Sequence, residues 1–73
     1  MQKTIYSNDH KIIVERLRKA REDVGLDQTQ VAKQFGKTQS FISKIESGQR
    51  RIDLVQLKAF AYLYKKKIEY FLP

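Results

Sequence analysis

Four polar residues near the middle of the chain share the spacing of one helix face: Gln39, Ser40, Ser43 and Lys44. At 100° per residue, a helix over residues 39–47 turns them to one side and turns Ile42 and Ile45 to the other. Glutamine can bond adenine through N6 and N7, lysine can donate to guanine O6 or N7, and serine can bond either base. The face therefore suits readout of base edges, although an ordinary solvated face has the same residue types.

Glycines and capping residues mark the elements that would position this face. Three glycines come just past stretches of helical periodicity, where a left-handed residue ends a helix: Gly25, Gly36 and Gly48. Residues that can cap the next helix follow them: Asp27, Thr38 and Asp53. The repeated stop and start predicts short helices joined by turns.

Apolar periodicity outlines the helices between these signals. The first helix is expected to begin near Asn8 or Asp9, because later apolar residues share one stripe at a helical period: Ile13, Leu17, Ala20 and Val24. Further helices are expected over residues 28–35, 39–47 and 54–64, with a short terminal piece over 68–72. Since no segment alternates as a strand would, we predict an all-α fold, a compact bundle of about five short helices.

The turn between the second and third predicted helices contains Gly36 and Lys37. Helices this short are marginal in water, so the first and fourth helices must hold them in place. A short glycine-containing turn is typical of the helix-turn-helix, whose second helix projects and can enter a major groove about 12 Å wide. We therefore interpret residues 28–47 as a helix-turn-helix and expect double-stranded DNA as the partner, with Gln39 and Lys44 as the strongest base contacts.

Composition agrees with a small globular domain that binds a polyanion. The 73 residues predict one domain, 1–73, in which residues 1–8 form an N-terminal arm. Lys and Arg number 15 against 8 Asp and Glu, and the net charge of +7 favours polyanions through long-range attraction and counterion release. No run approaches the ~20 apolar residues of a membrane span, and residues 1–9 lack the apolar stretch of a secretory signal. We therefore expect a cytoplasmic protein with no membrane partner.

The sequence lacks the residue patterns that catalysis or metal binding would need. It has no cysteine, and His10 has no second histidine with which to complete a zinc site or a catalytic dyad, so we expect His10 at the surface. It also has no phosphate-binding glycine loop and no nucleophile elbow. We expect no enzyme activity, no metal and no cofactor.

The stretch VGLDQTQVAKQFGKTQSFISKIESGQRR resembles the Cro and phage-repressor (XRE-like) type of helix-turn-helix family. The later stretches RIDLVQLKAFAYLY and KKKIEYFL are similar to the closing helices of that family. The resemblance implies a lambda-repressor-like DNA-binding domain. Three positions depart from the family pattern, in which Pro, a smaller aliphatic residue and Gly are common: Ile52, Tyr64 and Lys65.

The resemblance also implies roles for individual residues. The base-facing residues would be Gln39, Ser40, Ser43 and Lys44. Gln28, at the start of the second helix, would contact a phosphate, and the backbone N–H groups of that helix start favour an anion there. The remaining phosphate contacts would flank the third helix: Lys37, Thr38, Ser47, Gln49, Arg50 and Arg51.

Two charged residues fall at the edge of the predicted core. Arg21 lies on the apolar stripe of the first helix, and Glu46 follows Ile45 on the third. Charges in such positions usually have partners, and a free Glu46 would repel phosphate. We therefore expect an ion pair between Arg21 and Glu46, and the resemblance implies the same pair.

The C-terminal end is unusually apolar for so short a chain. Its large side chains either close the core or form an isologous dimer interface: Tyr62, Tyr64, Tyr70, Phe71 and Leu72. Because one short recognition helix reads few bases, we expect a homodimer that binds a palindrome with half-sites about 34 Å apart.

Two features are left between alternatives. Phe41 could touch a thymine methyl or a sugar, or it could cover the edge of the core. The lysines at 65–67 could hold phosphate, but they suit the dipole at a helix end and a solvated loop better.

These patterns favour a small transcriptional regulator, and a repressor over an activator. An antitoxin-like interaction protein, with another protein as its main partner and DNA binding as a secondary property, fits the same fold. An uncovered apolar patch near Tyr62 and Phe71 would support that alternative.

Overall fold

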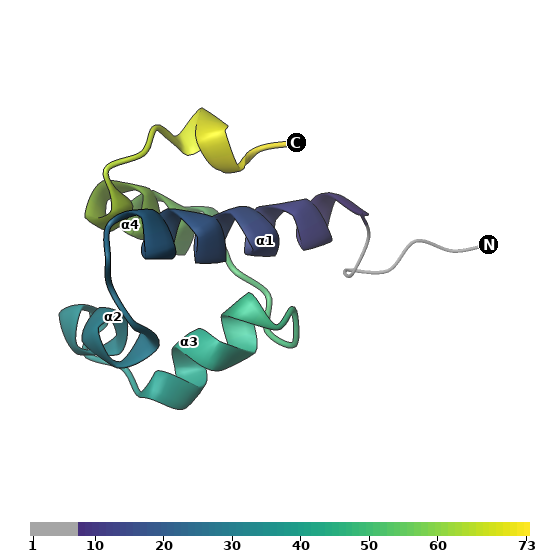
Figure 1. Cartoon of the computed structure of the whole chain (residues 1–73). Coiled ribbons are helices and arrows are strands. Elements are labelled where there is room, and N and C mark those ends of the chain that lie inside the picture. The colour runs from purple at the N-terminus through teal and green to yellow at the C-terminus, as the bar shows by residue number, and fades with distance from the viewer. Residues whose placement is uncertain (1–7) are drawn as a thin grey trace.

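Short helices account for most of the chain, as Figure 1 shows. The computed structural model describes residues 8–73. Its helices are α1 (Asn8–Asp23), α2 (Gln28–Phe35), α3 (Gln39–Glu46) and α4 (Leu54–Tyr64), followed by a 3-10 helix, η1 (Ile68–Phe71). There is no strand within residues 8–73, so the prediction of an all-α fold is confirmed.

Side-chain caps begin three of these helices. The carboxylate of Asp27 accepts the backbone N–H of Gln30 at 2.8 Å, and the Gln30 side chain accepts the N–H of Asp27 at 2.8 Å. Asp53 and Gln56 form the same reciprocal pair at the start of α4. Thr38 caps α3 with its hydroxyl. Such caps are each worth about 1 kcal/mol, and all three were predicted from the sequence.

Two helices end at a residue in the left-handed conformation. Gly36, with φ 64°, ends α2, and the absence of a Cβ makes this conformation available without strain. Lys65, with φ 59°, ends α4, where the same conformation costs an L-residue roughly 1 to 2 kcal/mol. The sharp end of α2 directs the chain into α3 after only three residues, 36–38.

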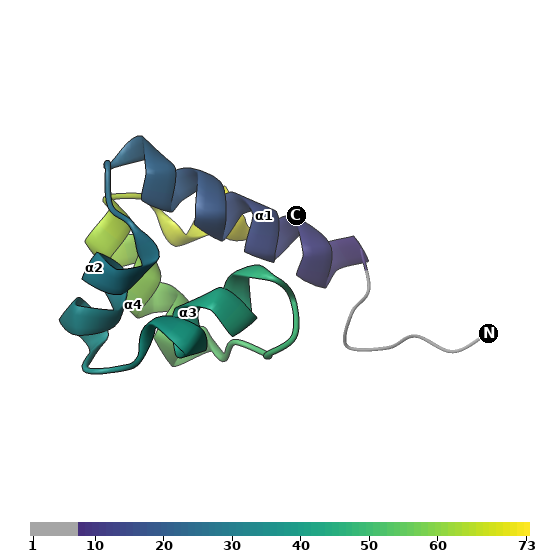
Figure 2. The ribbon, with the colours of Figure 1, turned by 60° about the horizontal axis from the view of Figure 1, so that its bottom comes forward.

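Helix α1 contacts three of the other four elements, and α2 packs against α3. Figure 1 shows α3 and η1 on opposite sides of α1, Figure 2 shows α2 and α3 side by side, and α1 contacts α3, α4 and η1. One core contains side chains from all five elements: Leu17, Ala20, Val31, Ala32, Ile42, Ile45, Leu57, Phe60, Ala61, Tyr64 and Phe71. Because Ile42 and Ile45 are both fully buried, α3 is anchored by its inner face and its outer face is left open to solvent.

The C-terminal end folds back onto α1. The guanidinium of Arg16 donates to the backbone oxygens of Tyr70 at 3.1 Å and Leu72 at 2.9 Å. Lys66 pairs with Asp23 at 3.4 Å. These contacts hold η1 against α1 and seat its phenylalanine in the core.

This arrangement corrects part of the predicted dimer interface. Tyr64 is 1% exposed and Phe71 is not exposed at all, so neither can contact a second protein. Tyr64 extends into the core from α4, and Phe71 extends into the core from η1. Tyr70 is half-buried, whereas Tyr62 and Leu72 remain exposed.

Smaller differences concern the ends of elements. The terminal piece is a single 3-10 helix, so four α-helices and η1 stand where about five short helices were predicted. Helix α3 ends at Glu46, and Ser47 is its C-cap residue. His10 is half-buried and not fully at the surface. The predicted N-terminal arm lies outside the described residues, except for Asn8, which begins α1.

None of the helices formed by residues 8–73 is long and apolar enough to cross a membrane.

Candidate nucleic-acid interface

The outer face of α3 carries the polar residues that the sequence singled out. Gln39, Ser40 and Lys44 are exposed, and Ser43 is half-buried. All four lie on the helix opposite its anchoring isoleucines. The structure therefore brings the predicted base-contacting residues together on one solvent-facing surface.

A continuous row of hydrogen bonds links this face to α1. Gln39 Nε2 donates to Gln28 Oε1 at 2.6 Å, and Gln28 Nε2 donates to Glu46 Oε1 at 3.0 Å. Glu46 in turn accepts from Arg21, with Nε to Oε2 at 2.8 Å and Nη2 to Oε1 at 3.1 Å. The first side chain of α3 is thus tied through α2 to a charged pair at the core boundary.

Gln39 keeps hydrogen-bonding capacity after it has bonded Gln28. Gln28 accepts one of the two hydrogens on the Gln39 amide nitrogen. The Gln39 amide oxygen accepts no hydrogen bond from residues 8–73. One N–H donor and one oxygen acceptor are what bidentate pairing with adenine requires. The bond to Gln28 therefore orients the Gln39 amide without consuming the groups that would read a base.

The Arg21 and Glu46 side chains are 12% and 5% exposed, so this is a largely buried ion pair. Its remaining polar groups are also bonded: Arg21 Nη1 donates to the backbone oxygen of Leu26 at 2.9 Å. The hydrogen bond to Glu46 raises the pKa of Arg21, against the opposing effect of burial. The pair expected from the sequence is present, and it joins α1 to α3.

Tyr64 lies close to this pair at the base of the core. Burial raises the pKa of its phenol well above the ordinary value, and the negative charge of Glu46 raises it further. Its hydroxyl has no hydrogen-bond partner among residues 8–73. Tyr64 is therefore a neutral, buried group at any physiological pH.

The start of α2 differs from the anion site that the sequence suggested. The carboxylate of Asp27 already accepts the backbone N–H of Gln30. A negative charge of the chain itself therefore lies at this helix start, where an external anion was expected. The Gln28 amide is committed to Glu46 and Gln39 and retains one N–H. A phosphate contact at Gln28 remains a prediction.

Positive side chains border the two ends of α3. The predicted phosphate-contacting residues that are exposed are Lys37, Thr38, Ser47, Gln49, Arg50 and Arg51. The Thr38 hydroxyl is engaged as a cap, and the Ser47 hydroxyl donates to the backbone oxygen of Lys44 at 3.2 Å. The lysine and arginine side chains of this set provide the mobile positive charge.

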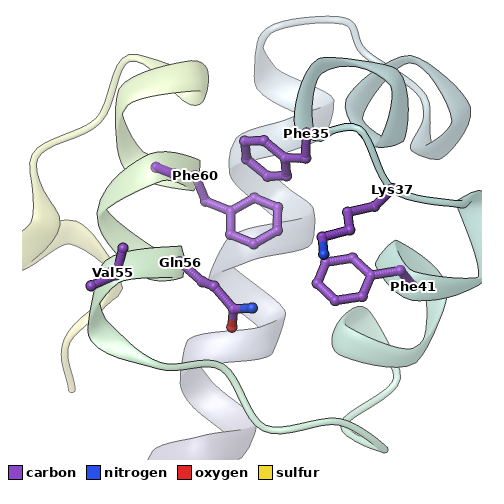
Figure 3. Close-up of a pocket in the computed structure, with 7 residues that line it drawn as sticks. Phe35, Lys37, Phe41, Val55, Gln56 and Phe60 are labelled. Carbon is purple, nitrogen blue, oxygen red and sulfur yellow. The ribbon is translucent and has the colours of Figure 1, made fainter.

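Sequence reasoning missed the contacts of Phe41. The Arg50 guanidinium lies 4.8 Å from the centroid of its ring, and the Lys37 ammonium lies 5.3 Å from it. The ring also lines a cavity of about 200 Å³, together with Phe35 and Phe60 (Figure 3). The sequence signal that could have predicted these contacts is an aromatic residue, Phe41, on a helix with basic residues just before and just after it.

A second exposed surface lies on α4 and the C-terminal end. Leu54 is 65% exposed, Tyr62 89% and Leu72 44%. These side chains line a shallow groove, whose other lining residues are Lys58, Ala61, Lys66 and Ile68. We call this surface the α4 patch. Within residues 8–73, no group of three or more His, Cys, Asp or Glu side chains is placed to hold a metal ion.

Comparison with solved structures places this geometry among known proteins. The restriction-modification controller protein C.AhdI from Aeromonas hydrophila superposes with a TM-score of 0.81 at 27% identity, over 96% of this chain and 100% of that chain. Hydroxypropylphosphonic acid epoxidase from S. wedmorenis, in complex with fosfomycin, gives a TM-score of 0.81 at 25% identity over 92% of this chain. The chain spans only about a third of the epoxidase, 36% of its length.

Sequence comparison gives the family. No curated protein sequence matches the chain. The family model described as helix-turn-helix matches residues 17–71, which include every element from the second half of α1 to η1. Because the match extends over most of the chain, the protein belongs to the helix-turn-helix family of DNA-binding domains, of the Cro and phage-repressor (XRE) type.

Proposed function

We propose that this protein is a homodimeric transcriptional repressor that reads a palindromic operator by inserting α3 into the major groove. The observation that carries the proposal is the bond of 2.6 Å between Gln39 and Gln28. It fixes an exposed amide at the N-terminal end of α3, the end that reaches base edges when a recognition helix enters a groove. A side chain held in place before binding loses less entropy on binding.

The residues around α3 divide into two groups with different tasks. Gln39, Ser40, Ser43 and Lys44 read bases, because they share the solvent-facing surface of the helix. Cations at its two ends, chiefly Lys37, Arg50 and Arg51, contact phosphates and set the register without sequence preference. Gln28 assists with its remaining N–H, which is directed to a phosphate next to the base that Gln39 reads.

The α4 patch is the proposed contact between protomers. Leu54, Tyr62 and Leu72 are exposed around one groove, and apolar side chains gathered in a patch often mark an interaction site. A second copy would bury them in an isologous interface and present two α3 helices to successive grooves. If another protein covers the α4 patch, the antitoxin-like alternative applies, and Tyr62 at 89% exposure is the observation that favours it.

C.AhdI supports a regulatory role for a chain of this extent. That controller protein is covered along its whole length, whereas the epoxidase is covered over about a third. The likeness to the epoxidase is therefore explained by a shared helical domain, and we propose no catalytic activity for this chain. A regulator acts where the chromosome lies, so we place it in the cytoplasm.

Selection of binding sites from random duplex DNA tests the proposal. The experiment is run at two salt concentrations, because phosphate contacts weaken steeply with salt whereas base contacts determine which sequences survive. We expect enrichment of one palindrome, with native mass spectrometry reporting two protomers on each duplex. Recovery of duplexes without any common motif would contradict sequence reading, and one protomer per site would contradict the dimer.

A further inference from the structure

Two basic side chains, those of Lys37 and Arg50, lie close to the ring of Phe41 on α3. The Lys37 ammonium and the Arg50 guanidinium lie 5.3 and 4.8 Å from the centroid of the same ring, within the range of cation–π attraction. Lys37 comes from the turn before α3 and Arg50 from the loop after it. One half-buried side chain of the recognition helix thus holds charges from both of its flanking segments.

The Phe41 side chain is half-buried and packs against the core. Phe35 and Phe60 meet edge to face with centroids 4.5 Å apart, and together with Phe41 they line the cavity of Figure 3. In that view the Lys37 side chain extends from the turn and reaches over the Phe41 ring. Phe41 is therefore held against the core while its ring lies beside both cations.

The two cations have no anionic partner of their own. Neither Lys37 nor Arg50 forms an ion pair with an acidic residue in the described part of the chain, and both are exposed. Each lies about 5 Å from one centroid, so they repel one another within a Debye length of about 10 Å. An anion bound beside both would relieve that repulsion.

We propose that Phe41 is a positioning residue for phosphate binding: its ring holds Lys37 and Arg50 as a pair that receives one segment of the DNA backbone. A guanidinium that lies against an aromatic ring keeps its N–H donors for phosphate oxygens. The pair thereby loses less side-chain entropy on binding. This inference rests on the proposed function and assigns Phe41 to phosphate contacts; it does not assign it to a thymine.

A double-mutant cycle on duplex DNA of mixed sequence tests the inference. Phe41→Leu keeps apolar bulk but removes the π face, and we expect it to weaken binding roughly two- to fivefold for each cation that it releases. In a Lys37→Ala, Arg50→Ala background, the same substitution should have no further effect. Phe41→Tyr, which keeps the ring, should bind as the wild type does.

Two controls separate positioning from loss of structure. Val55→Ala trims another wall of the same cavity, away from the cations, and should leave affinity unchanged. Circular-dichroism melts establish that each variant is folded at the assay temperature. Equal losses for Phe41→Leu in both backgrounds, or no loss in either, would overturn the inference while DNA binding stands. A wild-type chain that binds no duplex would overturn the proposed function, and this inference with it.

Discussion

The guanidinium of Arg21 meets the carboxylate of Glu46 with two parallel hydrogen bonds, Nε to Oε2 at 2.8 Å and Nη2 to Oε1 at 3.1 Å. This geometry joins α1 to the last residue of α3, so the recognition helix is fixed by a bidentate contact as well as by its isoleucines. Gln28 adds a third hydrogen bond to the same carboxylate. Glu46 therefore has two roles: it pairs with Arg21, which stabilises the fold, and it bonds Gln28, which orients Gln39.

Removal of one partner should be strongly destabilising. Glu46→Ala leaves the Arg21 charge buried without its carboxylate, and we expect a loss of about 3 kcal/mol in the free energy of unfolding. Lys19→Ala is the control, because its pair with Asp23 is exposed at 67% and 37%, and it should change stability by less than about 0.5 kcal/mol. Urea denaturation measures both. Similar losses for the two variants would contradict the account.

Tyr64 should make stability depend on alkaline pH. Its folded-state pKa lies above the ordinary value of 10.0, so the folded chain keeps a proton that the unfolded chain releases above that pH. The stabilisation is therefore complete below pH 10 and declines above it, by at most about 1.4 kcal/mol per pH unit. Tyr64→Phe should remove this decline and, because the hydroxyl is unpartnered, should cost little at neutral pH. Parallel curves for both proteins, from denaturation at a series of pH values, would count against this assignment.

The left-handed residue at the end of α4 offers a stabilising substitution. Lys65→Gly should raise the free energy of unfolding by up to about 1 kcal/mol, because glycine adopts φ 59° without a Cβ penalty. Lys67→Gly is the matched control: Lys67 has φ −74°, so glycine there only adds freedom to the unfolded chain and should lower stability. Thermal melts distinguish the two substitutions. A Lys65→Gly variant that melts below the wild type would refute the argument.

The α4 patch should control the oligomeric state. Tyr62→Asp places a charge in the proposed interface and should convert dimers to monomers without unfolding them, since Tyr62 is 89% exposed. Val55→Asp alters a similarly exposed apolar residue of the same helix, outside the groove of the patch, and should leave the dimer intact. Sedimentation velocity reports both states. Persistent dimers of Tyr62→Asp would show that the protomers meet elsewhere.

Local signals explain why most of the fold could be predicted. Asp27, Thr38 and Asp53 cap helices through groups only three residues away, so their roles depend on short-range chemistry. The spacing of Ile42 and Ile45 is enough to predict the buried face of α3. The Arg21 and Glu46 pair could be anticipated because two charges at a core boundary have few other ways to be neutralised.

Features that depend on how helices cross could not be predicted in the same way. The apolar residues of α4 lie on several faces, so the sequence did not distinguish Tyr64, which packs inward, from Leu54 and Tyr62, which do not. The bond between Gln28 and Gln39 joins residues 11 positions apart and depends on the angle between α2 and α3. The position of Arg50 over Phe41 depends on the path of the loop after α3.

The division between base reading and phosphate contact predicts different losses for two substitutions. Gln39→Ala should cost roughly 1 to 3 kcal/mol on the preferred operator and relax the preference at one base pair of each half-site. Arg50→Ala should weaken binding to all sequences alike. It should also reduce the slope of the logarithm of the binding constant against the logarithm of the salt concentration by about 1. Affinities on matched and mismatched duplexes measure both.

The central claim, that α3 reads sequence from Gln39, is tested most directly by repeating the binding-site selection with Gln39→Ala. We predict that the variant recovers the wild-type palindrome with one symmetric pair of positions now degenerate and the other positions unchanged. A variant that recovers the same palindrome with every position still specified would contradict the claim.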